Sequence, residues 1–420
     1  MVNKLFKKVL ELFLGIGPGI MAIGFTIGTG SVTSMIVAGS RFGMGLLWVL
    51  VLSCFFSFVL IEAYGRFALV TGQSALNAIR NHIKYGKVLA LFIIIGIAFG
   101  QTNSLIGILG ITANAVFEVF SLFFPVLSDH QYSIVLGLAI LIISVFYFLL
   151  WKGSYTVFEK VLVFFVTFLG LSFLGSFFIM MPETKDIAKG LIPEIPEVPG
   201  GKMLVAAFVG TTMAAATFIS RPLFIKGKGW TLANLKDQRK DAIWAACLIF
   251  IISASIMGVA TSVLFKNGKV IDNVLDMIYT LEPIAGKFAV VVFFLGLLSA
   301  GLSSIFPILM ITPIMIADYQ AGEMNTSSKQ FRIIAAISSL LAIVGIYFGG
   351  NPINIQILSQ VFNVFVLPLV IISILILTNN KRLMGEHKAG LFLNIGMALS
   401  LLFAFLVSYN GMVSVVDYFK

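Results

Sequence analysis

The chain contains eleven apolar stretches, each long enough to cross a lipid bilayer as a helix. A membrane-spanning helix needs about 20 predominantly apolar residues, and 59% of the 420 residues are hydrophobic while only 11% are charged. We therefore predict an all-α polytopic membrane protein, integral to the plasma (inner) membrane. The predicted spans are 12–40, 43–70, 87–120, 132–151, 157–181, 202–226, 240–266, 285–318, 331–349, 354–378 and 389–410.

Composition excludes several other classes of protein. The net charge of +10 is spread between the spans rather than gathered in one patch, so we expect no nucleic-acid partner. Cys54 and Cys247 fall within apolar spans and the three histidines lie in predicted loops, so no cysteine or histidine cluster for a metal is expected. Without a nucleophile–base set or a phosphate-binding loop, we predict neither an enzyme nor a bound cofactor. The first apolar stretch is too long for a cleavable signal peptide.

Basic residues gather in the loops on one side of the predicted bundle. They precede span 1 and lie between spans 2 and 3, 6 and 7, and 10 and 11, whereas the opposite loops, 182–201 and 267–284, mix acidic and basic residues. Because loops rich in lysine and arginine stay in the cytoplasm, we predict a cytoplasmic N-terminus. With an odd number of spans, the C-terminus is then expected outside.

Small polar residues interrupt the first span near its middle, where a lipid-facing helix would carry leucine or valine. Gly28, Thr29, Gly30 and Ser31 stand there; glycine is a poor helix former, and threonine and serine compete for backbone hydrogen bonds. We predict that one half-helix ends near Ile27 and a second begins near Ser31. Unpaired backbone at this depth is tolerated only inside protein or beside a cavity. The alternative is that the glycines allow two helices to pack closely.

Span 6 carries a second stretch of small residues, from Gly210 to Thr217, which we also interpret as a break. Alanine favours helix, so this break is inferred only from the small side chains and the flanking threonines. Spans 1–5 and 6–10 then form two sets of five, and an odd number inverts the second set. We place the first repeat at 1–191, the second at 192–378, and span 11 with the C-terminus at 379–420. Interrupted spans in matching positions of two halves indicate the site of a secondary transporter.

Five short motifs carry a resemblance to a known family. They are Gly17-Pro18-Gly19, Leu46-Leu47-Trp48-Val49-Leu50, Val70-Thr71-Gly72, Leu358-Ser359-Gln360-Val361 with Leu367-Pro368, and Arg382-Leu383-Met384-Gly385. In these motifs, and over most of its length, the chain resembles the Nramp family, whose members carry divalent metals with protons on a LeuT-type scaffold. The resemblance implies a LeuT-type 5+5 inverted repeat with spans 1 and 6 broken.

The metal-binding motifs of that family are missing. Its Asp-Pro-Gly-Asn motif in span 1 corresponds to residues 28–31, and its Met-Pro-His motif in span 6 corresponds to residues 214–216, all alanine. Met213 stands one place early, and a one-residue shift would restore it as a thioether ligand. The other corresponding positions are Ser104 and Gly107 for the acidic residues of span 3, Leu302 for a glutamine of span 8, and Gln360 for the span 10 glutamine, the one ligand in place.

The residues at the breaks favour an anion over a dehydrated divalent metal. Such cations prefer oxygen ligands that usually include carboxylates, and neither break contains one. Helix N-termini near Ser31 and Thr217 offer N–H groups and a positive dipole end. We predict a secondary-active transporter of a small inorganic anion, with bicarbonate the first choice, coupled to Na⁺ or H⁺. The predicted substrate-binding residues are Gly28, Thr29, Gly30, Ser31, Thr212, Ala214, Thr217, Gln360 and Asn363, and no metal site is predicted.

Two other functions stay open. One is a proton-coupled transporter of a divalent metal (Mn²⁺, Fe²⁺ or Mg²⁺) with an atypical site. The other is a carrier of a neutral solute, or a sensor, on the same scaffold. For the individual hydroxyl groups the alternative is a bond to the carbonyl four residues earlier in their own helix.

Other polar residues in the spans are candidates for ion coupling and for access. Ser303 and Ser304 in span 8 are candidate coupling-ion ligands, or else helix-packing residues. Glu62 is a candidate proton carrier, although Arg66 lies four residues on and would pair with it. Arg221 in span 6 would draw anions along an access path to the cytoplasm, or else anchor the helix at the membrane surface.

Overall fold

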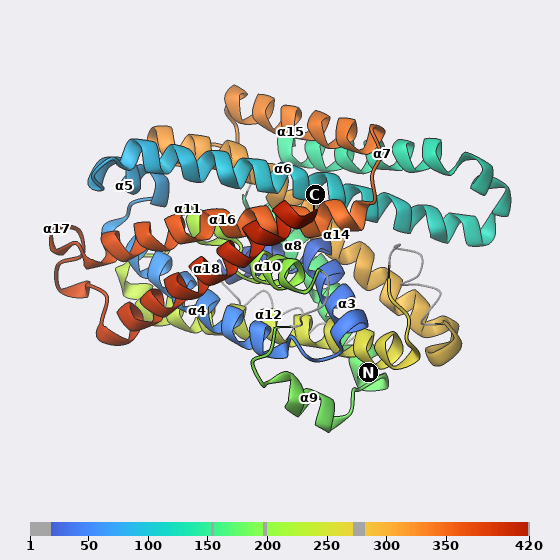
Figure 1. Ribbon diagram of the computed structural model, residues 1–420. Coiled ribbons are helices and arrows are strands. Elements are labelled where there is room, and N and C mark those ends of the chain that lie inside the picture. Colours follow the sequence, from blue (N-terminus) through green and yellow to red (C-terminus); the bar gives the residue numbers. More distant parts are fainter. Residues whose placement is uncertain (1–17, 153–154, 196–199, 272–281, 419–420) are drawn as a thin grey trace.

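The computed structural model describes residues 18–152, 155–195, 200–271 and 282–418, and these residues form helices and connecting turns without any strand (Figure 1). The helices are α2 (Gly19–Thr26), α3 (Thr29–Phe42), α4 (Leu47–Thr71), α5 (Ala75–His82), α6 (Gly86–Phe123), α7 (Gln131–Lys152), α8 (Tyr155–Ile179), α9 (Thr184–Gly190), α10 (Gly201–Thr212), α11 (Ala215–Gly227), α12 (Leu235–Val263), α14 (Glu282–Ala321), α15 (Lys329–Tyr347), α16 (Pro352–Asn379), α17 (Lys381–Met384) and α18 (Leu391–Tyr418), with 3-10 turns η1 (Pro125–His130), η2 (Leu232–Asn234), η3 (Phe265–Asn267) and η4 (Gly385–His387).

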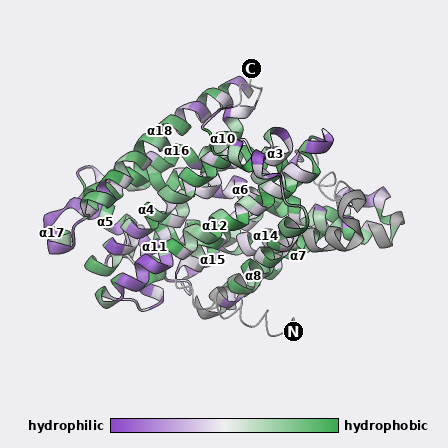
Figure 2. Ribbon diagram, turned by 90° about the horizontal axis from the view of Figure 1, so that it is seen from below, coloured by the Kyte–Doolittle hydropathy of each residue, from purple (hydrophilic) through white to green (hydrophobic). Residues whose placement is uncertain are grey.

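The membrane-length helices follow the predicted spans in order. Nine helical segments among the described residues are long and apolar enough to cross a membrane. The other two predicted spans correspond to the broken pair α2–α3 and to α8, while residues 12–17 of the first span lie outside the described residues. Hydrophobic residues cover the long helices, and hydrophilic residues gather near α17 (Figure 2). The chain is therefore an integral membrane protein.

Some connections that are predicted on opposite sides of the membrane lie at opposite ends of the bundle. In Figure 1, α5 and α17 lie at the left end, and the turn between α6 and α7 lies at the right end. The prediction places α5 and α17 on the same, cytoplasmic side, and they do share one end. Which end faces the cytoplasm stays a prediction, and so do the repeat boundaries at 191 and 378.

The broken helices form the centre of the bundle. The α10–α11 segment is 94% buried over its apolar window, whereas α7 and α15 are each only 28% buried. The outer helices expose large apolar side chains such as Leu141 and Leu340, as lipid-facing helices do. The small residues at the breaks are therefore enclosed by protein on all sides.

Asp318, near the end of α14, holds α5 at the edge of this bundle. Its carboxylate accepts hydrogen bonds from the N–H groups of Leu76 (3.1 Å) and Asn77 (3.3 Å), which belong to the first turn of α5 and have no partner within that helix. We expect Asp318→Ala to lower the free energy of unfolding by about 1–3 kcal/mol, because these groups lose a buried acceptor. Denaturation of the purified protein measures the change, and the exposed Asp129→Ala is the control. Equal effects of the two substitutions would contradict the assignment.

Candidate functional site

The first break consists of two residues between α2 and α3. Ile27 (φ −102°, ψ 77°) ends α2, its N–H donating to the carbonyl four residues earlier (2.7 Å), and Gly28 (φ −115°, ψ −169°) is the extended N-cap of α3. The break is where the sequence predicts it. The second half-helix begins at Thr29, two residues before the predicted Ser31, because the extended backbone of Gly28 sets its start.

The second break consists of Met213 (φ −109°, ψ 49°) and Ala214 (φ −61°, ψ 115°), between α10 and α11. The second half-helix again begins two residues before the predicted position, at Ala215 rather than Thr217. No side chain caps the N-terminus of α3 or of α11. The first N–H groups of both half-helices therefore lack a partner inside their own helix.

Helix α16 passes against both breaks at Gln360. A Cβ added to Gly30 would lie 2.7 Å from Gln360 Nε2, and a Cβ added to Gly210 would lie 1.9 Å from the Gln360 carbonyl oxygen. Only glycine lets backbones approach this closely. The structure therefore brings together Gln360 and the two interrupted spans, as the sequence analysis expects.

Five buried hydroxyl groups near the breaks have no hydrogen-bond partner in the described structure. Each of these side chains is at most 3% exposed. None of the hydroxyl groups donates to the carbonyl four residues earlier in its own helix, which was the alternative to a ligand role. A buried polar group without a partner costs about 1–3 kcal/mol, so a polar ligand is the natural partner. The residues are Thr29, Ser31, Thr33 and Ser34 on α3 and Thr217 on α11.

Carbonyl groups at the ends of the first half-helices do have partners. Three of them each accept a hydrogen bond from a hydroxyl group of another helix. The bonds run from Thr211 Oγ1 to Thr26 O (3.1 Å), from Ser304 Oγ to Gly24 O (3.2 Å) and from Ser57 Oγ to Thr212 O (2.7 Å).

Two predicted ligand hydroxyls bond their own helix instead. Thr212 Oγ1 donates to Phe208 O (2.8 Å) and Ser303 Oγ donates to Ala300 O (3.0 Å). Thr212 thus makes the bond to the carbonyl four residues earlier that was the alternative for the hydroxyl groups at the breaks. Ser304 differs, since its hydroxyl reaches α2.

Glu62 and Arg221 are both ion-paired. Glu62 Oε1 accepts a hydrogen bond from Arg66 Nη2 at 3.1 Å. Glu62 therefore forms the ion pair that was considered as the alternative to a role as proton carrier. Arg221 is only 1% exposed and donates to Gln238 and Asp241 of α12. It is therefore not a surface anchor, and Asp241 neutralises the charge that the predicted access path required.

Two amide side chains beside the breaks, Gln356 and Gln101, were not predicted. Gln356 and Gln360 both donate through Nε2 to Ser104 Oγ (3.0 and 3.2 Å), Asn363 Nδ2 donates to Gln360 Oε1 (3.2 Å), and Gln101 Nε2 donates to Asn363 Oδ1 (3.2 Å). The predicted Gln360 and Asn363 thus belong to one uncharged network between α6 and α16. The i, i+4, i+7 spacing from Gln356 to Asn363 is the signal that identifies this polar helix face.

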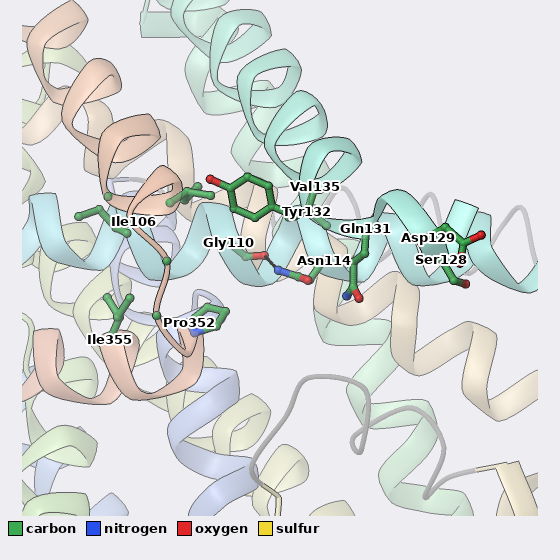
Figure 3. A pocket seen from close by; sticks show the side chains of 14 residues that line it. Ile106, Gly110, Asn114, Ser128, Asp129, Gln131, Tyr132, Val135, Pro352 and Ile355 are labelled. Atoms are coloured by element: carbon green, nitrogen blue, oxygen red, sulfur yellow. Dashed lines mark hydrogen bonds between the residues drawn. The ribbon is translucent and has the colours of Figure 1, made fainter. Parts of the chain in front are cut away.

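A cavity of about 500 Å³ lies elsewhere, where α6 and α7 meet the start of α16 (Figure 3). Asn114, Asp129 and Gln131 supply polar groups to its lining, and Tyr132 donates through its hydroxyl to Tyr347 O (2.8 Å). None of the predicted site residues lines it. The candidate site therefore stays at the two breaks.

Two interrupted helices buried at the centre of a helical membrane bundle are typical of the LeuT-type fold of secondary transporters. Solved structures share this fold. A mutant of the Eremococcus coleocola manganese transporter matches with a TM-score of 0.77 at 16% identity, covering 99% of this chain and 88% of that one. MhsT in complex with L-phenylalanine matches with a TM-score of 0.59 at 14% identity, covering 96% of this chain and 98% of that one.

The sequence comparison gives the family. The model of the family Nramp, described as natural resistance-associated macrophage protein-like, matches residues 19–414. The divalent metal cation transporter MntH of Klebsiella pneumoniae is 26% identical over 413 residues, with 94% of this chain and 92% of the relative covered. The chain belongs to the Nramp family, and at that level it is a membrane transporter rather than an enzyme.

Proposed function

We propose that this protein transports a small oxyanion, with bicarbonate the best candidate, in symport with Na⁺ or H⁺. One observation carries the proposal: at the breaks five buried hydroxyl groups have no partner among the described residues, while three nearby carbonyl groups each accept a hydrogen bond from a hydroxyl group of another helix. The hydroxyl groups of Ser31 and Thr217 are among the unpaired donors. The carbonyl groups of Thr26 and Thr212 are among the paired acceptors. A ligand that accepts hydrogen bonds fits this balance.

The N-termini of two half-helices also favour the binding of an anion. The N-termini of α3 and α11 both lie at the breaks and have no side-chain cap. Each presents backbone N–H groups and the positive end of a helix dipole. These donors are fixed before a ligand arrives, so binding an anion requires little rearrangement.

Bicarbonate also matches an unpaired amide acceptor beside the first break. Gln356 Oε1 is buried without a partner, and the amide nitrogen of the same side chain would lie 2.2 Å from a Cβ added at Gly30. Bicarbonate carries three oxygens that accept and one O–H that donates. A halide could satisfy the donors at the break but could not supply the hydrogen for Gln356.

Divalent metal transport is the second candidate, and the comparisons favour it. Relatives along nearly the whole chain are named divalent metal cation transporters. Met213, in the second break, and Gln360 would supply a thioether and an amide oxygen. Against this, no group of three or more His, Cys, Asp or Glu side chains that could hold a metal occurs among the described residues. Without a carboxylate, several kcal/mol of Coulomb attraction per charge is missing.

Uptake by reconstituted vesicles tests the proposal. We expect saturable uptake of ¹⁴C-bicarbonate, and its dependence on a Na⁺ gradient at clamped pH separates Na⁺ from H⁺ coupling. Ser31→Ala and Thr217→Val are each expected to lower uptake about 10-fold or more, because a hydrogen bond to a charged group contributes about 1.5–3 kcal/mol.

Thr167→Val is the matched control for these variants. Thr167 lies in α8, outside the interrupted spans, and its hydroxyl is equally buried and unpaired. It should leave uptake near the wild-type rate. Vesicles that take up Mn²⁺ but no bicarbonate, together with heat of Mn²⁺ binding in a calorimetric titration, would refute the anion and establish the second candidate.

A further inference from the structure

A buried charge cluster lies next to the second break, and the transport site as described above does not use it. Arg221 of α11 is 1% exposed, and Gln238 and Asp241 of α12 are 0% and 5% exposed. One nitrogen of the guanidinium, Nη2, donates to both Gln238 Oε1 and Asp241 Oδ2. Charges at this depth are expensive unless they are paired or functional.

Four helices meet at this cluster. Gln238 Nε2 donates to Ile61 O of α4 at 3.0 Å, one residue before Glu62. The Asp241 carboxylate lies against the first residue of α2, since a Cβ added at Gly19 would lie 2.8 Å from Oδ1. The cluster thus joins α11 and α12 to α2 and α4 on the predicted cytoplasmic side of the breaks.

Most N–H groups of the Arg221 guanidinium have no hydrogen-bond partner in the described part of the chain. Arg221 Nε and Nη1 have no partner, and neither does Asp241 Oδ1. An arginine has five N–H donors, and Nε and Nη1 together carry three of them. Buried unpaired donors in a native protein call for an explanation such as a ligand, and a guanidinium favours oxyanions.

Unpaired hydrogen-bond donors extend along α11 from the second break to Arg221. Thr217, with its own unpaired hydroxyl, is four residues before Arg221 and therefore lies on the same face of α11. The other charged pair nearby joins Glu62 of α4 to Arg66, whose side chain is 27% exposed, so it lies on α4 rather than on α11. An anion leaving the breaks along α11 would therefore meet Arg221 next.

We propose that Arg221 is a second anion-binding site, in which the anion replaces Asp241 as the partner of the guanidinium. This inference rests on the proposed function, since it extends the path of the same substrate. Asp241 serves as the internal counter-ion while the site is empty. Removing its charge leaves Arg221 buried and uncompensated, and an oxyanion from solution then takes its place.

Anion rescue of an Asp241 variant tests the proposal. The melting temperature of purified Asp241→Asn is measured against rising sodium bicarbonate or sodium nitrate, with sodium gluconate keeping ionic strength constant at fixed pH. We expect a lowered melting temperature that small oxyanions raise saturably by about 2–4 °C, beyond any rise in the wild type. The double variant Arg221→Met with Asp241→Asn should show no such rise.

Glu62→Gln is the matched control: it also removes a buried acid that pairs with an arginine, but Arg66 is 27% exposed, so its charge keeps water as a partner. It should show no oxyanion-dependent rise. The proposal is overturned if Asp241→Asn does not respond to oxyanions, or if the double variant responds equally. Rescue without any bicarbonate uptake by wild-type vesicles would refute the proposed function and leave the Arg221 site standing, whereas uptake without rescue would do the reverse.

Should Asp241→Asn fail to fold, Arg221→Lys supplies an independent measurement. Lysine keeps the charge but loses the planar set of donors. Bicarbonate efflux from loaded vesicles is then expected to fall about 10-fold. An unchanged rate would overturn the proposal.

Discussion

Gly210→Ala is expected to destabilise the protein strongly and to abolish transport. A Cβ at this position would lie 1.9 Å from the carbonyl oxygen of Gln360 and 2.7 Å from its carbon. These are backbone atoms of a packed helix, which cannot turn aside as a flexible side chain can. Overpacking of a core costs about 1–3 kcal/mol, and here it also forces α10 away from α16 beside the break. Thermal denaturation and vesicle uptake measure the two effects.

Gly137→Ala is the matched control for this substitution. Gly137 also lies inside a membrane-length helix, α7, but nothing lies within 4 Å of an added Cβ. Since alanine has a higher helix propensity than glycine by about 1 kcal/mol, this variant should be at least as stable as the wild type. If both variants melted alike, α10 and α16 could not be as close as described.

Gly28→Ala is expected to reduce uptake at least about 10-fold, and Ser304→Gly in the same chain is expected to restore part of it. The added Cβ would lie 1.8 Å from Ser304 Oγ and 2.6 Å from Ser304 Cβ. The serine would have to leave, and with it the hydrogen bond to Gly24 O. A free-energy change of about 1.4 kcal/mol at the site suffices for a 10-fold effect.

Ser303→Gly is the control for the rescue. Ser303 is the neighbour of Ser304 on α14, but its hydroxyl bonds its own helix, and it is not among the neighbours of an added Cβ at Gly28. Rescue by Ser303→Gly, or the absence of rescue by Ser304→Gly, would show that crowding against Ser304 is not the cause. The same contact explains why introducing the family's aspartate at Gly28 alone should not create a metal site.

Local chemistry was enough to predict the spans and the breaks. A hydrophobic stretch must become a helix in the bilayer because its backbone has no other partner there. Gly28 marks the first break because glycine is a poor helix former, and the structure adds that only glycine leaves room there for Ser304, whose Oγ would lie 1.8 Å from an added Cβ. The start of each second half-helix was predicted two residues late. Hydroxyl residues favour caps, but at Gly28 and Ala214 the extended backbone sets the boundary without any side-chain cap.

Contacts between distant parts of the chain could not be predicted in the same way. Nothing near Arg221 in sequence shows that its partner is Asp241, because the pair forms only when α11 packs beside α12. The roles of the serines likewise depend on which helix faces them: Ser304 meets α2, while Ser303, one residue earlier, turns back on its own helix. A spacing rule gives the face of a residue, but the neighbour on that face comes from the tertiary structure.

The hydroxyl groups that cap the carbonyls at the breaks join helices that belong to different spans. Parting α2 from α10 breaks the bond from Thr211 to Thr26, and parting α2 from α14 breaks the bond from Ser304 to Gly24. Each loss costs about 1 kcal/mol unless a ligand or water takes over. These bonds therefore resist any movement that parts the helices until another group takes the place of the lost partner.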